Sequence, residues 1–328
     1  MTTKRWVAII VAVVLLVFSV GFRFAMNFAS GMLDELTDMD TSTLSEETEE
    51  EGDMTNRIAV LNLEGTIQEQ EESFVSEGYQ HDAFMDSIEN AAEDDTIKGI
   101  VLKINSPGGA VGATEDIHKA LKEIQDDYEK PIYVSMGETA ASGGYYSAAN
   151  ADKIFAKPST LTGSIGVIMQ STDFSGLAEK YGVKFNTIKS GKHKDIMSPT
   201  KEMTDDEEDI LQSMVDEMYD EFVQVIVDGR DMDEDKVREL GDGRVYTGKQ
   251  AEENGLVDEV GDYDEALKAM KEDNDLEDAA VVSYGYDFGI FGSFQAKMES
   301  LIQGKDKDLE VVSKLMDESD RPRAMYLY

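Results

Sequence analysis

Hydrophobic and polar positions alternate along the middle of the chain in two recurring patterns. Short apolar runs rich in β-branched residues are typical of buried strands, and apolar residues three or four positions apart are typical of amphipathic helices. The predicted strands lie at 58–67, 97–106 and 130–137, and the predicted helices lie at 81–94, 112–127 and 142–151. This alternation predicts an α/β domain with a mostly parallel sheet.

Three later segments extend this organisation. LAEKYGV (177–183) predicts a further helix, KFNTIKS (184–190) predicts a further strand, and residues 204–230 predict a long helix. Thr204 and Glu207 have the spacing of a capping box at the start of this helix. Five apolar residues step by four along one of its faces: Ile210, Met214, Met218, Phe222 and Ile226. A stripe of this kind is typical of a protein core or a subunit interface.

The first residues of the chain carry a membrane-targeting pattern. Lys4 and Arg5 precede an uncharged run of 17 residues from Trp6 to Phe22. As a helix this run would span about 25 Å, near the lower limit for a membrane crossing. Basic residues before the run favour a cytoplasmic N-terminus. We expect a single-pass anchor in the cell membrane, with a cleaved signal peptide as the alternative. In either case the bulk of the chain lies outside the cytoplasm.

The chain divides into four predicted parts. Residues 1–26 form the membrane anchor, and the acidic residues 27–56, which are poor in aromatic side chains, form a linker. The regular α/β pattern is expected over 57–290. Residues 291–328 form a less regular C-terminal extension that contains the apolar stretch AMYLY.

Charge and composition exclude several classes of function. The formal net charge of −39 argues against nucleic acid as a partner, because phosphate binding needs clustered Lys and Arg. We interpret the acidic excess as a solubility property suited to a saline or alkaline exterior. The absence of cysteine excludes disulfides, zinc–thiolate sites and cysteine nucleophiles. We expect neither a cofactor nor a metal ion.

A glycine-rich turn follows the second predicted strand, in INSPGGAVGA (104–113). Pro107 fixes one backbone angle, and Gly108 and Gly109 allow backbone angles that other residues avoid. Free N–H groups at such a turn can stabilise an anionic oxygen, although a glycine pair between a strand and a helix is often structural. The turn is not a phosphate loop, because no Gly-Lys-Ser/Thr follows it.

The stretch ETAASGGYYSAAN (138–150) repeats this design after the next strand and places Ser142 among small residues. Ser142 is either the N-cap of a helix or a nucleophile, and the N–H of Gly143 could face an oxyanion. Two glycine-rich turns at successive strand ends favour the nucleophile. The carboxyl edge of an open parallel sheet is where α/β proteins place their sites.

A serine nucleophile needs a base, and the sequence offers histidines and lysines. The three histidines, His81, His118 and His193, do not lie in apolar, glycine-rich surroundings, so a Ser-His-Asp triad is disfavoured. A lysine can serve as a base if burial keeps it neutral. TIKSGKHKDIMSPT (187–200) supplies three candidates, and the pattern alone does not choose among them: Lys189, Lys192 and Lys194.

Several spaced motifs together resemble one known family. They are INSPGGAV, ETAASGGYYSAANADKIFA, TLTGSIGVI, IKSGKHKDIMSPT and GRVYTGKQAEENGLVDEVG. In this combination and order they resemble the bacterial signal peptide peptidase A (SppA) family, serine peptidases of family S49, in the single-repeat form. The resemblance covers nearly the whole chain after the anchor. It implies a Clp protease/crotonase-like α/β fold with repeated ββα-type units, in addition to the N-terminal transmembrane helix.

The resemblance also implies roles for individual residues. Ser142 corresponds to the nucleophile, and Lys194, the lysine of the SG-x-x-K-D pattern, corresponds to the general base. Ser164 in TGSIGV matches a position that would help orient the lysine. The oxyanion donors would be the N–H groups of Gly143 and of Gly109 or Gly108. At these positions the chain does not depart from the family's pattern.

Partners and substrates follow from the same resemblance. It implies a homo-oligomer, an octamer in the single-repeat form, whose neighbouring protomers contribute base and nucleophile to one site. The substrates would be remnant signal peptides and other small peptides, and AMYLY could occupy the groove as a product-like or inhibitory tail. A catalytically inactive membrane scaffold of the same fold and a crotonase-like acyl-CoA enzyme are the alternatives.

Overall fold

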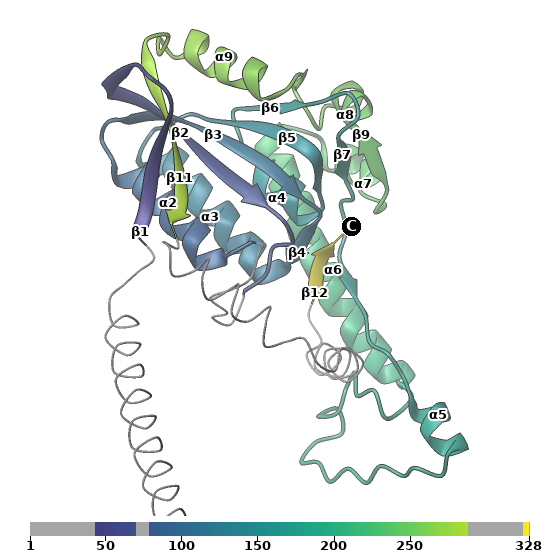
Figure 1. Cartoon of the computed structure of the whole chain (residues 1–328). Helices are drawn as coiled ribbons and strands as arrows, with labels where there is room; N and C mark the ends of the chain where they lie inside the picture. Colours follow the sequence, from purple (N-terminus) through teal and green to yellow (C-terminus); the bar gives the residue numbers. More distant parts are fainter. Residues whose placement is uncertain (1–42, 70–78, 288–323, 328) are drawn as a thin grey trace, which may run out of the picture.

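A nine-stranded sheet forms the centre of the protein in the computed structural model, which describes residues 43–69, 79–287 and 324–327 (Figure 1). Its strands are β1 (Thr43–Glu50), β2 (Asp53–Glu64), β3 (Ile97–Ser106), β5 (Ile132–Ala141), β6 (Lys153–Ala156), β7 (Leu161–Gly163), β9 (Val245–Thr247), β10 (Glu259–Val260) and β11 (Ala279–Asp287). The main path runs β1-β11-β2-β3-β5-β6-β10, and β7 pairs with both β5 and β9. The pairs from β11 to β10 are parallel, so the predicted mostly parallel α/β sheet is confirmed.

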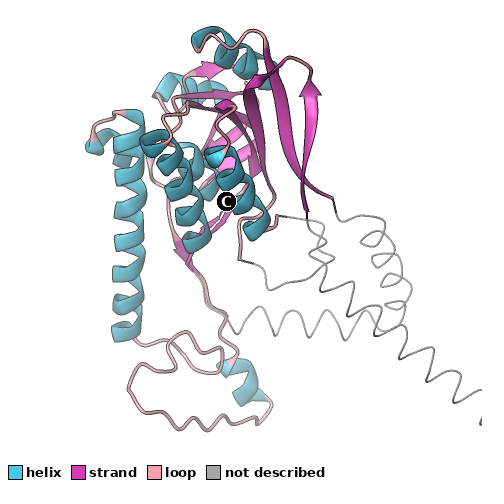
Figure 2. Cartoon of the chain, turned by 90° about the vertical axis from the view of Figure 1, so that its left-hand side faces the viewer, coloured by secondary structure: helices cyan, strands magenta, loops and turns pink. Residues whose placement is uncertain are grey.

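Helices cover both faces of this sheet (Figures 1 and 2). They are α2 (His81–Glu93), α3 (Val111–Asp127), α4 (Gly143–Ala148), α5 (Ser175–Lys180), α6 (Asp205–Arg230), α7 (Glu234–Leu240), α8 (Gly248–Asn254) and α9 (Tyr263–Asp273). Side chains of α2, α3, α4 and α6 share one buried apolar cluster, and those of α9 belong to a second cluster. The long helix predicted over 204–230 is therefore confirmed as α6.

The apolar run of β2 shows how the sequence produces this layered arrangement. Ala59, Leu61 and Leu63 belong to the cluster that contains α2 and α3, whereas Ile58 and Val60 belong to the cluster that contains α9. Successive residues of a strand point to opposite faces, so a strand covered on both faces needs apolar residues at every position.

A second sheet of three short strands lies at the carboxyl edge of the main sheet. It contains β4 (Gly108–Ala110), β8 (Ile168–Met169) and β12 (Ala324–Leu327), in the order β4-β12-β8, and both pairings are antiparallel. The β12 strand is the described part of the predicted C-terminal extension. It comes from a stretch far along the chain and is inserted between two segments of the α/β body.

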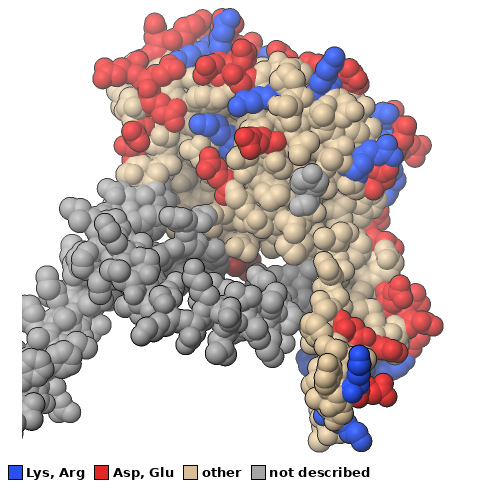
Figure 3. All heavy atoms as spheres, turned by 45° about the vertical axis from the view of Figure 1, so that its right-hand side comes forward, with Lys and Arg blue, Asp and Glu red and all other residues tan. Residues whose placement is uncertain are grey.

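Residues 170–214, which we call the arm, project from the body (Figures 1, 2 and 3). The arm includes the first turns of α6. The arm exposes many large apolar side chains: Phe174, Leu177, Tyr181, Val183, Phe185, Ile188, Met203, Ile210 and Met214. The apolar stripe predicted on the long helix is thus divided. Phe222 and Ile226 lie in the core, and Ile210 and Met214 are exposed on the arm.

Two expectations from the sequence are wrong in detail. Residues 43–50, predicted to be part of the acidic linker, form β1, and β2 begins at Asp53 instead of near Arg57. An edge strand is held by backbone hydrogen bonds to β11, which do not require apolar side chains. In addition, Arg57 forms ion pairs with Glu46 of β1 and with Asp94, so an acidic residue of the supposed linker has a defined partner.

The strand predicted at 184–190 is also absent: these residues have no regular structure and are exposed. A strand needs an edge to pair with, and the arm offers none among the residues that the structure describes. The predicted anchor, residues 1–26, lies outside the described residues. Within the described ranges, no helix has the length and apolar character that a membrane crossing would require.

Candidate active site

Ser142 lies between the end of β5 and the start of α4 in a strained turn. Its φ of 54° and ψ of −118° are unfavourable for a residue with a Cβ. The turn is held by a hydrogen bond from Ser142 N to Gly163 O (2.8 Å) and another from Tyr146 N to Ser142 O (2.8 Å). The Ser142 side chain does not cap α4, and its buried Oγ has no hydrogen-bond partner in the described structure. Ser142 therefore occupies the N-cap position of α4 without making the capping hydrogen bond, and its hydroxyl is left for another role.

The two glycine-rich turns meet beside Ser142. A Cβ on Gly108, whose φ is 99°, would lie 2.6 Å from Gly143 N, and one on Gly143 would lie 3.2 Å from Gly109 N. A Cβ on Gly109 would overlap the carbonyl oxygen of Ile67. Side chains are therefore sterically excluded here, and backbone N–H groups from both turns converge on one small region. The N–H of Gly108 donates to Ser106 Oγ (3.1 Å).

The β12 strand lies across this region as an extended peptide. Tyr326 is paired with Gly109 and Leu327 with Gly108, while Met325 is paired with Ile168 on the other side. The carbonyl oxygen of Tyr326 is so close to the glycine turn that a Cβ on Gly108 would overlap it. A main-chain carbonyl thus lies at the glycine turn, and β12 pairs with β4 and β8 as a peptide that adds a strand to a sheet edge would.

The side chain of Tyr326 fills an aromatic pocket between α3, α4 and α6. Its ring stacks on Tyr146 with centroids 5.1 Å apart and meets Phe222 edge-on at 4.8 Å. Its hydroxyl donates to the carbonyl oxygen of Met218 (3.2 Å). His118 packs edge-on against Tyr146 at 5.0 Å, and burial lowers the pKa of His118 to about 4. The pocket is therefore lined by aromatic rings and by an imidazole that is neutral near neutral pH, and it accepts a large aromatic side chain.

None of the three histidines acts as a partner of Ser142 within this chain, because Ser142 Oγ has no hydrogen bond among the described residues. His81 Nδ1 instead contacts Tyr79 Oη (2.8 Å), and His193 faces Glu207 (3.8 Å). A serine–histidine pair is therefore absent from the described structure.

The three candidate lysines lie on the arm, in the segment before α6. Lys189 is ion-paired with Asp195 (2.5 Å), and Lys192 is ion-paired with Asp206. The exposed Lys194 makes no side-chain hydrogen bond or ion pair in the described part of the chain. An ion pair favours the protonated amine, whereas a base must be neutral. Within one chain the structure does not bring Lys194 to Ser142, whose Oγ has no partner.

Ser164 lies close to Ser142, because Gly163 and Ala141 are paired residues of the parallel strands β7 and β5. Ser164 is buried, has a φ of 50°, and its N–H donates to Arg244 O (2.8 Å). The structure thus brings Ser142, Ser164 and the three glycines together and leaves Lys194 apart.

Sequence reasoning missed the aromatic pocket. Tyr146, Phe222 and Tyr326 come from three distant segments, and nothing local in their sequence marks them as neighbours. It also assigned Glu207 only to a helix cap, although this carboxylate binds Lys201 as well. The sequence pattern does not distinguish these residues from ordinary core or surface residues.

The buried serine in a strained turn, the converging backbone N–H groups and the extended peptide beside them define a serine hydrolase that acts on peptides. The family described as Peptidase family S49 matches residues 124–277 of the chain. A protein of Enterococcus faecium named for the signal peptide peptidase SppA is 39% identical over 344 aligned residues, which cover 100% of this chain and 99% of that protein. The chain therefore belongs to peptidase family S49, in its SppA group, and is a serine-type protease.

Two further relatives support this assignment. Protease 4 of Haemophilus influenzae is 32% identical over 83% of this chain and 46% of its own length. The chloroplastic serine protease SPPA of Arabidopsis thaliana is 31% identical over 66% of this chain and 32% of its own length. Both relatives are much longer than the part that this chain matches.

Proposed function

We propose that this protein is a membrane-anchored endopeptidase that degrades remnant signal peptides and other small peptides with a Ser142–Lys194 dyad. One observation carries the proposal: a peptide strand lies beside Ser142 with its Tyr326 carbonyl at the glycine turn. The name of the Enterococcus faecium relative supports the substrate class. An aromatic pocket suits the apolar side chains of signal-peptide cores.

In this mechanism Ser142 Oγ attacks the carbonyl carbon of the bound peptide, and its proton passes to Nζ of Lys194. The resulting oxyanion accepts hydrogen bonds from backbone N–H groups. Gly143 and Gly109 are the favoured donors, because the N–H of Gly108 is already bound to Ser106 Oγ. Lys194 then donates the proton to the leaving amine, and an acyl-enzyme on Ser142 remains. Water hydrolyses the acyl-enzyme with Lys194 again acting as the base.

Lys194 reaches Ser142 from a neighbouring protomer in this proposal. The unpartnered Ser142 Oγ and the exposed position of Lys194 support a site completed by a second copy. The apolar side chains of the arm support it as well, since an exposed patch of this kind is typical of an interface. Docking the arm on a neighbour would bury the amine and favour its neutral form. A ring of eight protomers is the assembly that we propose.

Three further assignments belong to the same proposal. Ser164, which lies beside Ser142, orients the lysine when it arrives. The strand 324–327 is an internal occupant that competes with substrates for the groove. Residues 1–26 anchor the chain in the cell membrane with a cytoplasmic N-terminus, so the peptidase domain lies outside the cytoplasm. The α/β body has the Clp protease/crotonase-like fold.

A fluorogenic peptide with an aromatic residue before the cleaved bond tests the dyad directly. We expect Ser142→Ala and Lys194→Ala each to abolish cleavage, because one removes the nucleophile and the other the base. Matched variants are Lys189→Ala and Lys192→Ala, which we expect to retain activity. Cleavage retained by Lys194→Ala would overturn the base assignment. Absence of cleavage by the wild type on any peptide would favour an inactive scaffold, and hydrolysis of an acyl-CoA would favour a crotonase-like enzyme.

A further inference from the structure

Glu207 is the one buried residue between positions 170 and 221, a fully described stretch in which every other residue is at least partly exposed. Only 2% of its surface is accessible. A carboxylate is rarely buried unless it is paired, because removing a charge from water is costly. Its burial at the start of α6, in an otherwise solvated arm, therefore points to specific partners.

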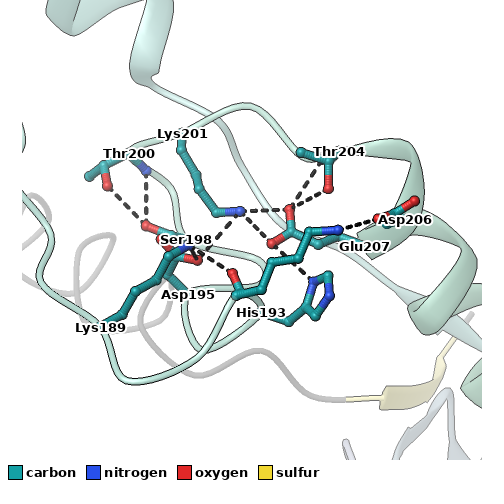
Figure 4. A network of polar contacts seen from close by, with 10 residues as sticks. Lys189, His193, Asp195, Ser198, Thr200, Lys201, Thr204, Asp206 and Glu207 are labelled. Atoms are coloured by element: carbon teal, nitrogen blue, oxygen red, sulfur yellow. Dashed lines mark hydrogen bonds and ion pairs between the residues drawn. The ribbon is translucent and has the colours of Figure 1, made fainter.

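Those partners exceed what a helix cap requires. Glu207 accepts hydrogen bonds from the backbone N–H and the hydroxyl of Thr204 (3.1 Å each), which form the cap. Both of its carboxylate oxygens also accept from Lys201 Nζ (2.6 Å each), and His193 Nδ1 lies 3.8 Å away (Figure 4). The hydrogen bonds from Lys201, followed by those from Thr204, lower the pKa of Glu207 to about 2. The carboxylate is therefore charged at every pH at which a neutral lysine could act.

The same network reaches both neighbours of Lys194 but holds only one of them by its side chain. His193, which precedes Lys194, has its Nδ1 3.8 Å from Glu207, and this nitrogen has no hydrogen-bond partner in the described structure. Asp195, which follows it, pairs with Lys189 (2.5 Å) and lies 3.6 Å from Lys201 Nζ, so Lys201 links Asp195 to Glu207 (Figure 4). Backbone hydrogen bonds tighten the segment further, from Lys194 N to Gly191 O (3.3 Å) and from Ile196 N to His193 O (3.1 Å).

This arrangement fixes the backbone at Lys194 and leaves its side chain free. We propose that Glu207 is the positioning residue of the general base: through Lys201 and Asp195 it attaches the Lys194 segment to the start of α6. The inference rests on the proposed role of Lys194. Its physical reason is that a base must be held within a fraction of an ångström of its productive position, which an exposed loop does not achieve alone.

Glu207→Gln is the discriminating variant, because glutamine keeps the capping box and removes the charge that holds Lys201. We expect kcat for the fluorogenic peptide to fall about 10- to 100-fold with KM unchanged, since the strand in the groove pairs with β4 and β8, which lie outside the arm. Lys201→Met should give a similar loss, and Lys201→Arg should restore most of the activity. Glu208→Gln is the matched control: it makes the same substitution at the next, exposed residue of α6, and we expect wild-type kcat.

The oligomer mass and the kinetic constants separate positioning from a general structural role. If Glu207 acts only through Lys194, Glu207→Gln keeps the wild-type mass in native mass spectrometry and the wild-type KM, whereas general damage would change both. Wild-type kcat in both Glu207→Gln and Lys201→Met would overturn the inference, as would a rise in KM alone or the same loss in Glu208→Gln. If Lys194→Ala itself remains active, the dyad is wrong, which is a distinct outcome from a failure of Glu207 alone. If Glu207→Gln does not assemble, Lys201→Met and Lys201→Arg decide.

Discussion

Ser142 and Ser164 directly follow Ala141 and Gly163, two residues that face each other in parallel strands, and both serines have φ values near 50°. The backbone N–H of Ser142 donates to the carbonyl of Gly163 (2.8 Å), which locks the two turns together. A left-handed conformation is unfavourable for serine, so two such turns side by side mark a site that is maintained for function. The geometry brings two hydroxyl-bearing residues to the same end of the sheet.

Replacing Ser164 by alanine should therefore lower kcat without affecting the fold. We expect a loss of about 10- to 100-fold, because Lys194 would lose a hydrogen-bond partner that orients it. Steady-state kinetics on the fluorogenic peptide measure this loss. Ser213→Ala, on the exposed arm part of α6, is the control and should behave as wild type. Unchanged kcat in Ser164→Ala would remove Ser164 from the mechanism.

The parallel sheet and the two glycine turns could be predicted from the sequence because both depend on local patterns. Runs such as 97–106 are apolar at nearly every position, as a strand covered on both faces requires. Gly108 and Gly143 are needed because a Cβ at either position would meet backbone or a buried hydroxyl. Such constraints are visible in the residue types themselves.

Features that depend on distant partners could not be predicted. The acidic strand β1 exists because β11 offers a backbone edge, and the segment 184–190 is not a strand because it has no such edge. The local pattern does not separate Lys189, Lys192 and Lys194, whereas the structure gives the first two ion pairs to Asp195 and Asp206. These contacts form only in the folded chain, and the local sequence pattern does not indicate them.

Mixing two inactive variants should restore activity if the site is shared between protomers. Ser142→Ala subunits retain Lys194, and Lys194→Ala subunits retain Ser142, so a mixed assembly contains some complete sites. For random mixing in equal amounts we expect about a quarter of the wild-type activity, because each head-to-tail interface must combine the two intact residues. The measurement is peptide cleavage after the two variants are dissociated and reassembled together. No recovery, with mixed assemblies verified by native mass spectrometry, would show that nucleophile and base belong to the same chain.

Acid should destabilise the aromatic pocket through His118. Burial lowers the pKa of His118 from 6.5 to about 4, so the unfolded chain binds this proton at a higher pH than the folded chain does. The free energy of unfolding should therefore fall as the pH decreases from about 6.5 to about 4. Urea unfolding at several pH values, followed by far-ultraviolet circular dichroism, measures the slope of the unfolding free energy against pH. In His118→Gln the slope over this window should be shallower, and parallel curves for the two proteins would contradict the assignment.

Removing the side chain that fills the aromatic pocket should activate the enzyme towards added peptides. Tyr326 is fully buried against Tyr146 and Phe222, and β12 pairs with β4, so a substrate must first displace this strand. Competition of this kind raises the apparent KM by the reciprocal of the fraction of open sites and leaves kcat unchanged. For Tyr326→Ala we expect KM to fall by roughly tenfold, because the strand loses its aromatic anchor.

Deleting residues 321–328 should have the same effect, whereas replacement of the exposed Tyr128 by alanine should have none. An unchanged KM in both Tyr326→Ala and the deletion variant would mean that β12 does not compete with substrates, and a loss of kcat would mean that the strand helps to build the site.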